Sequence, residues 1–213
     1  YIKTTSVAAS LPRFTHDPTP EFTNLLLQSE DITTTWVQLF SPKATLTAND
    51  TTAPDGSLTA DKIAATNDTS GFGVYQGYTF GAGPYTFSVY AKEGTEKYLA
   101  LDFSNVNVQG ALFDLNAGTA SDETSGVTAT ITSVGSGWYR CSISKTMASS
   151  SVFPEFYISN ASRDRTFAAA GTEDLYVWGA QLETGSVASA YLPTTTVAAH
   201  SAREPLGLLI EEA

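Results

Sequence analysis

The stretch that decides the fold is DLYVWGAQLE, which runs from Asp174 to Glu183. Apolar and aromatic residues alternate along it, so that one face holds Leu175, Val177 and Gly179 and the other holds Tyr176, Trp178 and Ala180. A period of two is typical of a strand in a sheet, because successive side chains of a strand point to opposite faces. We therefore predict that residues 174–183 form the last strand of a β-sandwich.

The segment after this strand repeats the beginning of the chain. Residues 191–199 read YLPTTTVAA and residues 1–9 read YIKTTSVAA. This repeat indicates one module with the start of a neighbouring module, or of a connector to it, attached. We predict an extended N-terminal connector at residues 1–22, a sandwich at residues 23–193, and a C-terminal connector at residues 194–213 that leads to or contacts a neighbouring module. Because the chain begins with Tyr1, we expect it to be part of a longer protein.

Strand patterns recur along the rest of the chain at regular spacing. They cover residues 23–28, 36–40, 44–48, 74–80, 85–91, 98–104, 109–115, 127–131, 138–144 and 153–159. Gly81-Ala82-Gly83-Pro84 predicts a hairpin between residues 74–80 and 85–91, and Gly135-Ser136-Gly137 predicts a second hairpin. Many short strands without a convincing helix predict an all-β fold, an antiparallel β-sandwich of jelly-roll type.

Composition and charge exclude several classes of partner. The formal net charge is −11, and clustered lysines and arginines, which phosphate binding requires, are absent, so we expect no nucleic acid partner. No apolar run is long enough to span a bilayer, so we expect no membrane insertion. Cys141 is the only cysteine, which excludes an intrachain disulfide and predicts a buried thiol on the strand face of Tyr139 and Ile143.

The sequence carries no constellation typical of an enzyme. A Ser-His-Asp triad would need His16 or His200, and both lie in the flanking segments. A Gly-x-Ser-x-Gly motif does not occur. The carboxylate pairs Asp122-Glu123 and Glu173-Asp174 fall in predicted loops, where solvation explains them better than a glycosidase dyad does. We therefore predict a protein that is not an enzyme.

Sugar binding needs exposed aromatic rings that stack on the apolar face of a sugar, with polar groups beside them for its hydroxyls. Counting by two places a set of such residues opposite the apolar faces of their strands: Tyr90, Tyr98, Asp102, Arg140 and Tyr157. These are our candidate carbohydrate-binding residues. The alternative is that they cover the outside of a sheet or pack against a neighbouring subunit. We interpret Trp36, Trp138 and Trp178 as packing anchors.

Several phrases carry a resemblance to a known family. They are TNLLLQSED at residues 23–31, TAPDG at 52–56 with ADKI at 60–63, GWYRC at 137–141, and WGAQLE at 178–183, followed by YLPTT at 191–195. In this order they resemble a module of tailed-phage virion proteins found in head-spike, fibre and tail-fibre proteins, which itself resembles carbohydrate-binding jelly rolls. LLIEEA at residues 208–213 is similar to the segment that often stands before the TNLLLQSE phrase. The resemblance covers residues 23–213.

The resemblance also implies partners and a metal. It implies a place on the capsid or tail surface of a virion, other virion proteins as partners, host-surface glycan as a ligand, and a homo-oligomer. Jelly rolls of this type often hold a structural calcium near their first and last strands. Glu30, Asp31 and Glu183 are the acids in those places, and their oxygens suit Ca²⁺.

Three functions stay open on the sequence alone. The leading hypothesis is a non-enzymatic virion surface module that mediates adhesion to host carbohydrate. The first alternative is a purely structural decoration or connector domain of the virion that binds no glycan. The second alternative is a carbohydrate-binding module attached to a secreted hydrolase, which the repeated flank at residues 1–9 and 191–199 disfavours.

Overall fold

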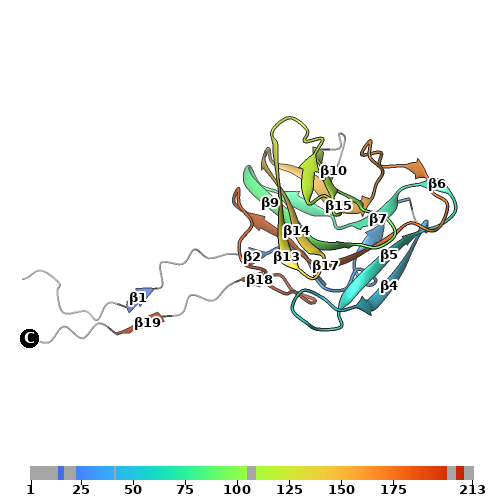
Figure 1. Cartoon of the computed structure of the whole chain (residues 1–213). Helices are drawn as coiled ribbons and strands as arrows, with labels where there is room; N and C mark the ends of the chain where they lie inside the picture. Colours follow the sequence, from blue (N-terminus) through green and yellow to red (C-terminus); the bar gives the residue numbers. More distant parts are fainter. Residues whose placement is uncertain (1–13, 17–22, 41, 105–108, 201–204, 209–213) are drawn as a thin grey trace, which may run out of the picture.

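The structure, a computed structural model, describes residues 14–16, 23–40, 42–104, 109–200 and 205–208. These residues form strands, turns and loops, and none of them lies in a helix. Two antiparallel sheets pack against each other (Figure 1). The predicted all-β class, an antiparallel β-sandwich of jelly-roll type, is thereby confirmed.

The first layer, the six-stranded sheet, has the strand order β13, β14, β9, β17, β5, β4. Its members are β13 (Val127–Gly135), β14 (Trp138–Met147), β9 (Gly83–Glu93), β17 (Asp174–Thr184), β5 (Ala60–Ala65) and β4 (Ala44–Thr51). The strand that the opening stretch predicts, β17, therefore lies between β9 and β5 in the middle of this sheet. The predicted hairpin at Gly135-Ser136-Gly137 joins β13 to β14 and is confirmed.

The second layer, the seven-stranded sheet, has the order β12, β11, β10, β15, β7, β3, and β8 also pairs with β15. Its members are β12 (Thr119–Ser121), β11 (Gln109–Asp114), β10 (Tyr98–Ser104), β15 (Ser150–Ile158), β7 (Phe72–Tyr75), β3 (Val37–Gln38) and β8 (Tyr78–Phe80). Three short pairs complete the described strands: β16 (Phe167–Ala168) with β6 (Thr69–Ser70), β18 (Ala199–His200) with β2 (Thr23–Asn24), and β1 (Phe14–His16) with β19 (Pro205–Leu208).

The core between the sheets is rich in aromatic rings. Phe103 of the seven-stranded sheet lies with its ring centroid 6.3 Å from that of Phe87 in the six-stranded sheet, and Phe156 lies at the same distance from Phe87. The apolar faces predicted for residues 98–104 and 109–115 both point into this core. Cys141 is fully buried as predicted, and burial raises the pKa of its thiol.

The decisive strand β17 contains a β-bulge that period-two counting does not show. Leu175 and Val177 face the core, and so do Ala180 and Leu182, although the two pairs differ in parity. The pairing register with β9 shifts between Trp178 and Gln181, where Gly179 has a φ of 62°. One extra residue in a strand reverses which faces its later side chains occupy. The second half of β17 therefore returns its apolar side chains to the core.

All three tryptophans are packing anchors, as predicted. Trp36 lies in the main core, whereas Trp138 and Trp178 lie in a smaller cluster on the outer face of the six-stranded sheet. Each indole donates a hydrogen bond: Trp36 to the Gln28 carbonyl, Trp138 to the Thr52 carbonyl, and Trp178 to the Thr59 hydroxyl. A buried indole N–H normally needs such a partner, so these loops are fixed to the sheets.

The predicted hairpin between residues 74–80 and 85–91 is wrong. The first run is divided into β7 and β8, which both pair with β15, whereas β9 pairs with β14 and β17 in the other sheet. The turn at Gly81 therefore moves the chain from one layer to the other. Aromatic packing explains the crossing, because the Tyr85 ring lies 4.6 Å from the Phe80 ring and the Tyr85 hydroxyl accepts a hydrogen bond from the Gly81 N–H.

The predicted strand at residues 23–28 is shorter than expected, since β2 covers only Thr23–Asn24. Beyond it, Gln28 has a φ of 49°, and the Gln28 and Ser29 N–H groups donate to the Thr195 and Thr194 carbonyls. Thr194 is itself buried. The first residues of the predicted C-terminal connector are therefore bonded to the sandwich.

Both ends of the chain leave the sandwich beside each other (Figure 1). In the described parts of the two flanking segments, β19 pairs with β1 of the same chain, so the C-terminal segment has the N-terminal segment as its partner. Residues 1–13, 17–22, 201–204 and 209–213 of the two predicted connectors lie outside the described residues. A search of the described residues finds no helix long and apolar enough to cross a membrane.

Candidate functional site

The five candidate carbohydrate-binding residues are divided between the two outer faces of the sandwich. Tyr98, Asp102 and Tyr157 lie on the seven-stranded sheet, and Tyr90 and Arg140 lie on the six-stranded sheet. Counting by two therefore placed each residue on an outer face correctly, but a ligand bound to one face cannot contact all five.

Asp102 and Tyr157 are not exposed, and the expectation that they are was wrong. Both are fully buried, and the Tyr157 hydroxyl donates a 2.6 Å hydrogen bond to the Asp102 carboxylate. Arg163, from the segment after β15, covers them and forms an ion pair with Asp102. Burial raises the pKa of Asp102, while Arg163 and Tyr157 oppose this rise by stabilising the ionised form. The two residues therefore form a buried polar network.

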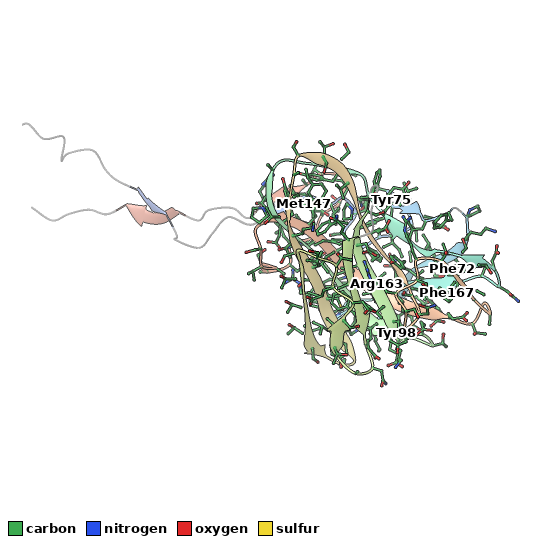
Figure 2. The ribbon with its side chains drawn as sticks, turned by 90° about the horizontal axis from the view of Figure 1, so that it is seen from above. Phe72, Tyr75, Tyr98, Met147, Arg163 and Phe167 are labelled. Carbon is green, nitrogen blue, oxygen red and sulfur yellow. The ribbon has the colours of Figure 1, made fainter. Side chains whose placement is uncertain are left out.

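Tyr98 is half-buried on the outer face of the seven-stranded sheet. It packs against a small apolar cluster on this face that includes Ala100, Leu112 and Tyr157. In the view of Figure 2, Arg163 lies between Tyr98 and Tyr75. Tyr75 belongs to the same cluster and marks the side of this face where a groove opens.

This groove, which we call the aromatic groove, has a volume of about 440 Å³ on the outer face of the seven-stranded sheet. It is lined by Val37, Gln38, Leu39, Phe40, Tyr75, Ser104, Phe153, Glu155 and Arg165. The rings of Tyr75 and Phe153 meet edge to face at 5.2 Å, and Phe153 is 37% exposed. Apolar side chains with this much exposure offer rings that a ligand can cover.

A neutralised charge pair lies under these rings. Arg165 donates a 2.7 Å hydrogen bond to Glu155, whose side chain is buried, whereas about a third of the Arg165 side chain is exposed. Burial raises the pKa of Glu155 to about 7, and Arg165 opposes the rise. With Glu155 ionised the two charges cancel, and with Glu155 protonated the positive charge of Arg165 remains, so the groove presents Arg165 donors and no net negative charge.

Phe40 closes one side of the aromatic groove in a strained conformation. Its φ is 51°, a left-handed value that is rare for a bulky residue, and its ring is 51% exposed. The Arg165 guanidinium lies 5.3 Å from the ring centroid. A Cβ on Gly71 would lie 2.9 Å from the ring, so this glycine gives the ring its space. Strained backbone conformations cluster at active and ligand-binding sites, so the conformation of Phe40 is compatible with a role in binding.

The second groove, which we call the hydroxyl groove, contains the two remaining candidates, Tyr90 and Arg140. It has a volume of about 510 Å³ on the outer face of the six-stranded sheet, and β9, β13, β14 and residues 186–188 line it. The Arg140 guanidinium lies 5.4 Å from the Tyr90 ring centroid. Tyr90 also packs against Trp178, at 5.2 Å. The structure thus brings together these two predicted residues.

The three acids predicted to hold calcium are separately engaged. Their hydrogen-bond donors are Tyr191 for Glu30, Thr33 for Asp31, and Gln181 and Ser189 for Glu183. Among the described residues, no group of three or more His, Cys, Asp or Glu side chains could hold a metal ion. The calcium site stays a prediction.

Sequence reasoning missed most of the aromatic groove. Phe153 and Glu155 alternate with Tyr157 on β15, so the period that selected Tyr157 could have selected them too. Phe40 gives no such signal, because its exposure depends on a turn after β3.

Comparison with known proteins adds a distant likeness to solved structures. No protein-family model matches the chain, and neither does any curated protein. A solved structure, the CBM22-1 and GH10 modules of Clostridium thermocellum endo-1,4-β-D-xylanase 10B complexed with xylohexaose, is similar over 78% of this chain at 14% identity and a TM-score of 0.42. The match covers only 28% of that chain.

Proposed function

We propose that this chain is a non-enzymatic module that binds a neutral carbohydrate in the aromatic groove. The observation that carries the proposal is the group of partly exposed rings, Phe40, Tyr75 and Phe153, over the neutralised Glu155–Arg165 pair. Rings can stack on the apolar face of a sugar, and Arg165 can donate to its hydroxyls. Because the Glu155–Arg165 pair has no net charge when Glu155 is ionised, a neutral ligand suits the groove above the pKa of Glu155.

The carboxylates of this face support binding rather than catalysis. Asp102 and Glu155 are directly paired in register on β10 and β15, which resembles the placement of a carboxylate dyad. However, each one forms an ion pair with an arginine, and Asp102 does not line the groove. A glycosidase needs one free acid and one free base beside the scissile bond. Neither carboxylate is free for that role.

A glycan array with neutral and acidic glycans, followed by calorimetry with the best neutral oligosaccharide, tests the proposal. Phe153→Ala should weaken that binding by about fivefold or more, since the ring loses an apolar contact worth about 1 kcal/mol. Leu58→Ala is the matched control, because Leu58 is 63% exposed and lies outside the groove. If no neutral glycan binds, or if both variants bind equally well, the proposal fails.

A structural connector role is the second candidate, and one observation favours it. Segments near the two ends of the chain pair with each other in β2–β18 and again in β1–β19, so both flanking segments meet the sandwich at the same place, as a connector domain requires.

We also propose that the chain lies on a virion surface, that its partners are other virion proteins, and that it forms a homo-oligomer. These rest on the phrases that resemble tailed-phage modules. Sedimentation equilibrium tests the oligomer, and a purely monomeric chain would contradict it.

A further inference from the structure

One side of the hydroxyl groove is a regular array of short polar side chains, and Val134, Val187 and Ala188 also line the groove. Thr128, Thr130 and Thr132 of β13 pair in register with Ser144, Ser142 and Arg140 of β14. All three threonines are exposed. Neighbouring strands lie about 4.8 Å apart and alternate side chains about 7 Å apart, so these hydroxyls form an even grid of donors and acceptors.

Arg140 is the single charged residue that lines this groove. Its guanidinium donates 3.1 Å to the Ser88 hydroxyl and also to the Ser189 carbonyl, which fixes its direction. Glu183, the acid beside Ser189, is buried and accepts from the Ser189 N–H, so it does not face the groove. Because Arg140 carries the one charge of the groove lining, a carboxylate placed beside it meets a positive partner, although the net charge of −11 opposes the approach of an anion from a distance.

We propose that the hydroxyl groove is a second binding site, which takes an acidic sugar chain of the uronic acid class. The carboxylate of one sugar residue lies at Arg140, and the sugar hydroxyls lie along the threonines and serines of β13 and β14. A guanidinium binds a carboxylate well because two parallel N–H···O hydrogen bonds can form. The threonine and serine hydroxyls can donate hydrogen bonds to the hydroxyls of a sugar chain and accept hydrogen bonds from them. This proposal stands independently of the aromatic groove, which lies on the opposite sheet.

Calorimetry with trigalacturonic acid and with its fully methyl-esterified form tests the charge requirement. The two probes share one sugar chain, and only the first carries carboxylates. We expect the acid to bind and the ester to bind at least about tenfold more weakly, because charge-assisted hydrogen bonds are the stronger ones. Equal binding of both probes, or no binding of the acid, would overturn the proposal.

Variants then place the ligand. Arg140→Gln should weaken acid binding by about tenfold or more, and Thr130→Val by about threefold, since each loses hydrogen bonds to the ligand. Thr45→Val is the matched control, because Thr45 is an exposed threonine of β4 at the other edge of the same sheet. If Arg140→Gln fails to fold, Thr130→Val and Thr132→Val carry the test.

Phe153→Ala separates this site from the aromatic groove. It should leave the affinity for trigalacturonic acid unchanged while lowering the affinity for a neutral glycan. Should Phe153→Ala abolish acid binding while Thr130→Val preserves it, the acid lies in the aromatic groove and the second site does not exist.

Discussion

Replacing Phe40 separates backbone strain from ligand contact. Its left-handed φ of 51° costs an L-residue about 1–2 kcal/mol, which Phe40→Gly would remove. Its ring is 51% exposed, so about half of the roughly 2 kcal/mol that a buried Phe contributes would be lost with it. The two terms nearly cancel. Phe40→Gly should therefore change the free energy of unfolding by less than about 1 kcal/mol.

Phe40→Ala is the matched comparison, because it removes the same ring and keeps the strained φ. We expect Phe40→Ala to be less stable than Phe40→Gly by about 1 kcal/mol in urea unfolding. Both variants should lose about fivefold in affinity for a neutral glycan, since the sugar can no longer cover the exposed half of the ring. The strain argument is refuted if the glycine variant is the less stable one. The site argument is refuted if either variant keeps its full affinity.

Three further predictions concern buried groups. Burial raises the pKa of Glu155 to about 7 and that of Asp61 to about 6, above their unfolded values, so the folded state holds these protons more tightly. Stability should therefore rise as pH falls from about 8 to about 5, and Glu155→Gln should flatten the rise in thermal midpoint. Tyr157→Phe should cost about 1–3 kcal/mol in urea unfolding, and Tyr98→Phe, at a half-exposed position, less than about 0.5 kcal/mol. Cys141, with its thiol pKa raised by burial, should react with iodoacetamide, as followed by mass spectrometry, only when urea is present.

The strands and their faces could be predicted from the sequence because alternation is a local property. Leu99 and Leu101 point to the core as their spacing indicated. Alternation does not tell which sheet receives a strand, so it could not separate β8 from β9. Nor does it reveal a bulge, because Gly179 looks like any other glycine until the parity of the apolar residues on its two sides is compared.

The candidate site could be predicted only in part, for a related reason. Period-two counting placed Asp102 and Tyr157 on an outer face, but burial depends on what covers that face. Here the cover is Arg163, which lies in an irregular segment with no periodic signal. Tyr90 and Arg140 were placed in one groove because their strands β9 and β14 pair directly, with the two residues opposite each other. Which strands pair depends on the arrangement of the whole sheet, so the sequence of either strand alone does not predict that Tyr90 and Arg140 meet.

The segment after β15 has a consequence for binding that follows from its charges. Asp102 and Glu155 lie opposite each other on β10 and β15, where two like charges would destabilise the sheet. Arg163 and Arg165 each neutralise one of them, so a single segment removes the repulsion. Arg165 also lines the aromatic groove, where it can donate to a sugar hydroxyl. A bound sugar would therefore stabilise the segment that keeps the two carboxylates buried, which couples occupancy of the aromatic groove to the order of this outer face.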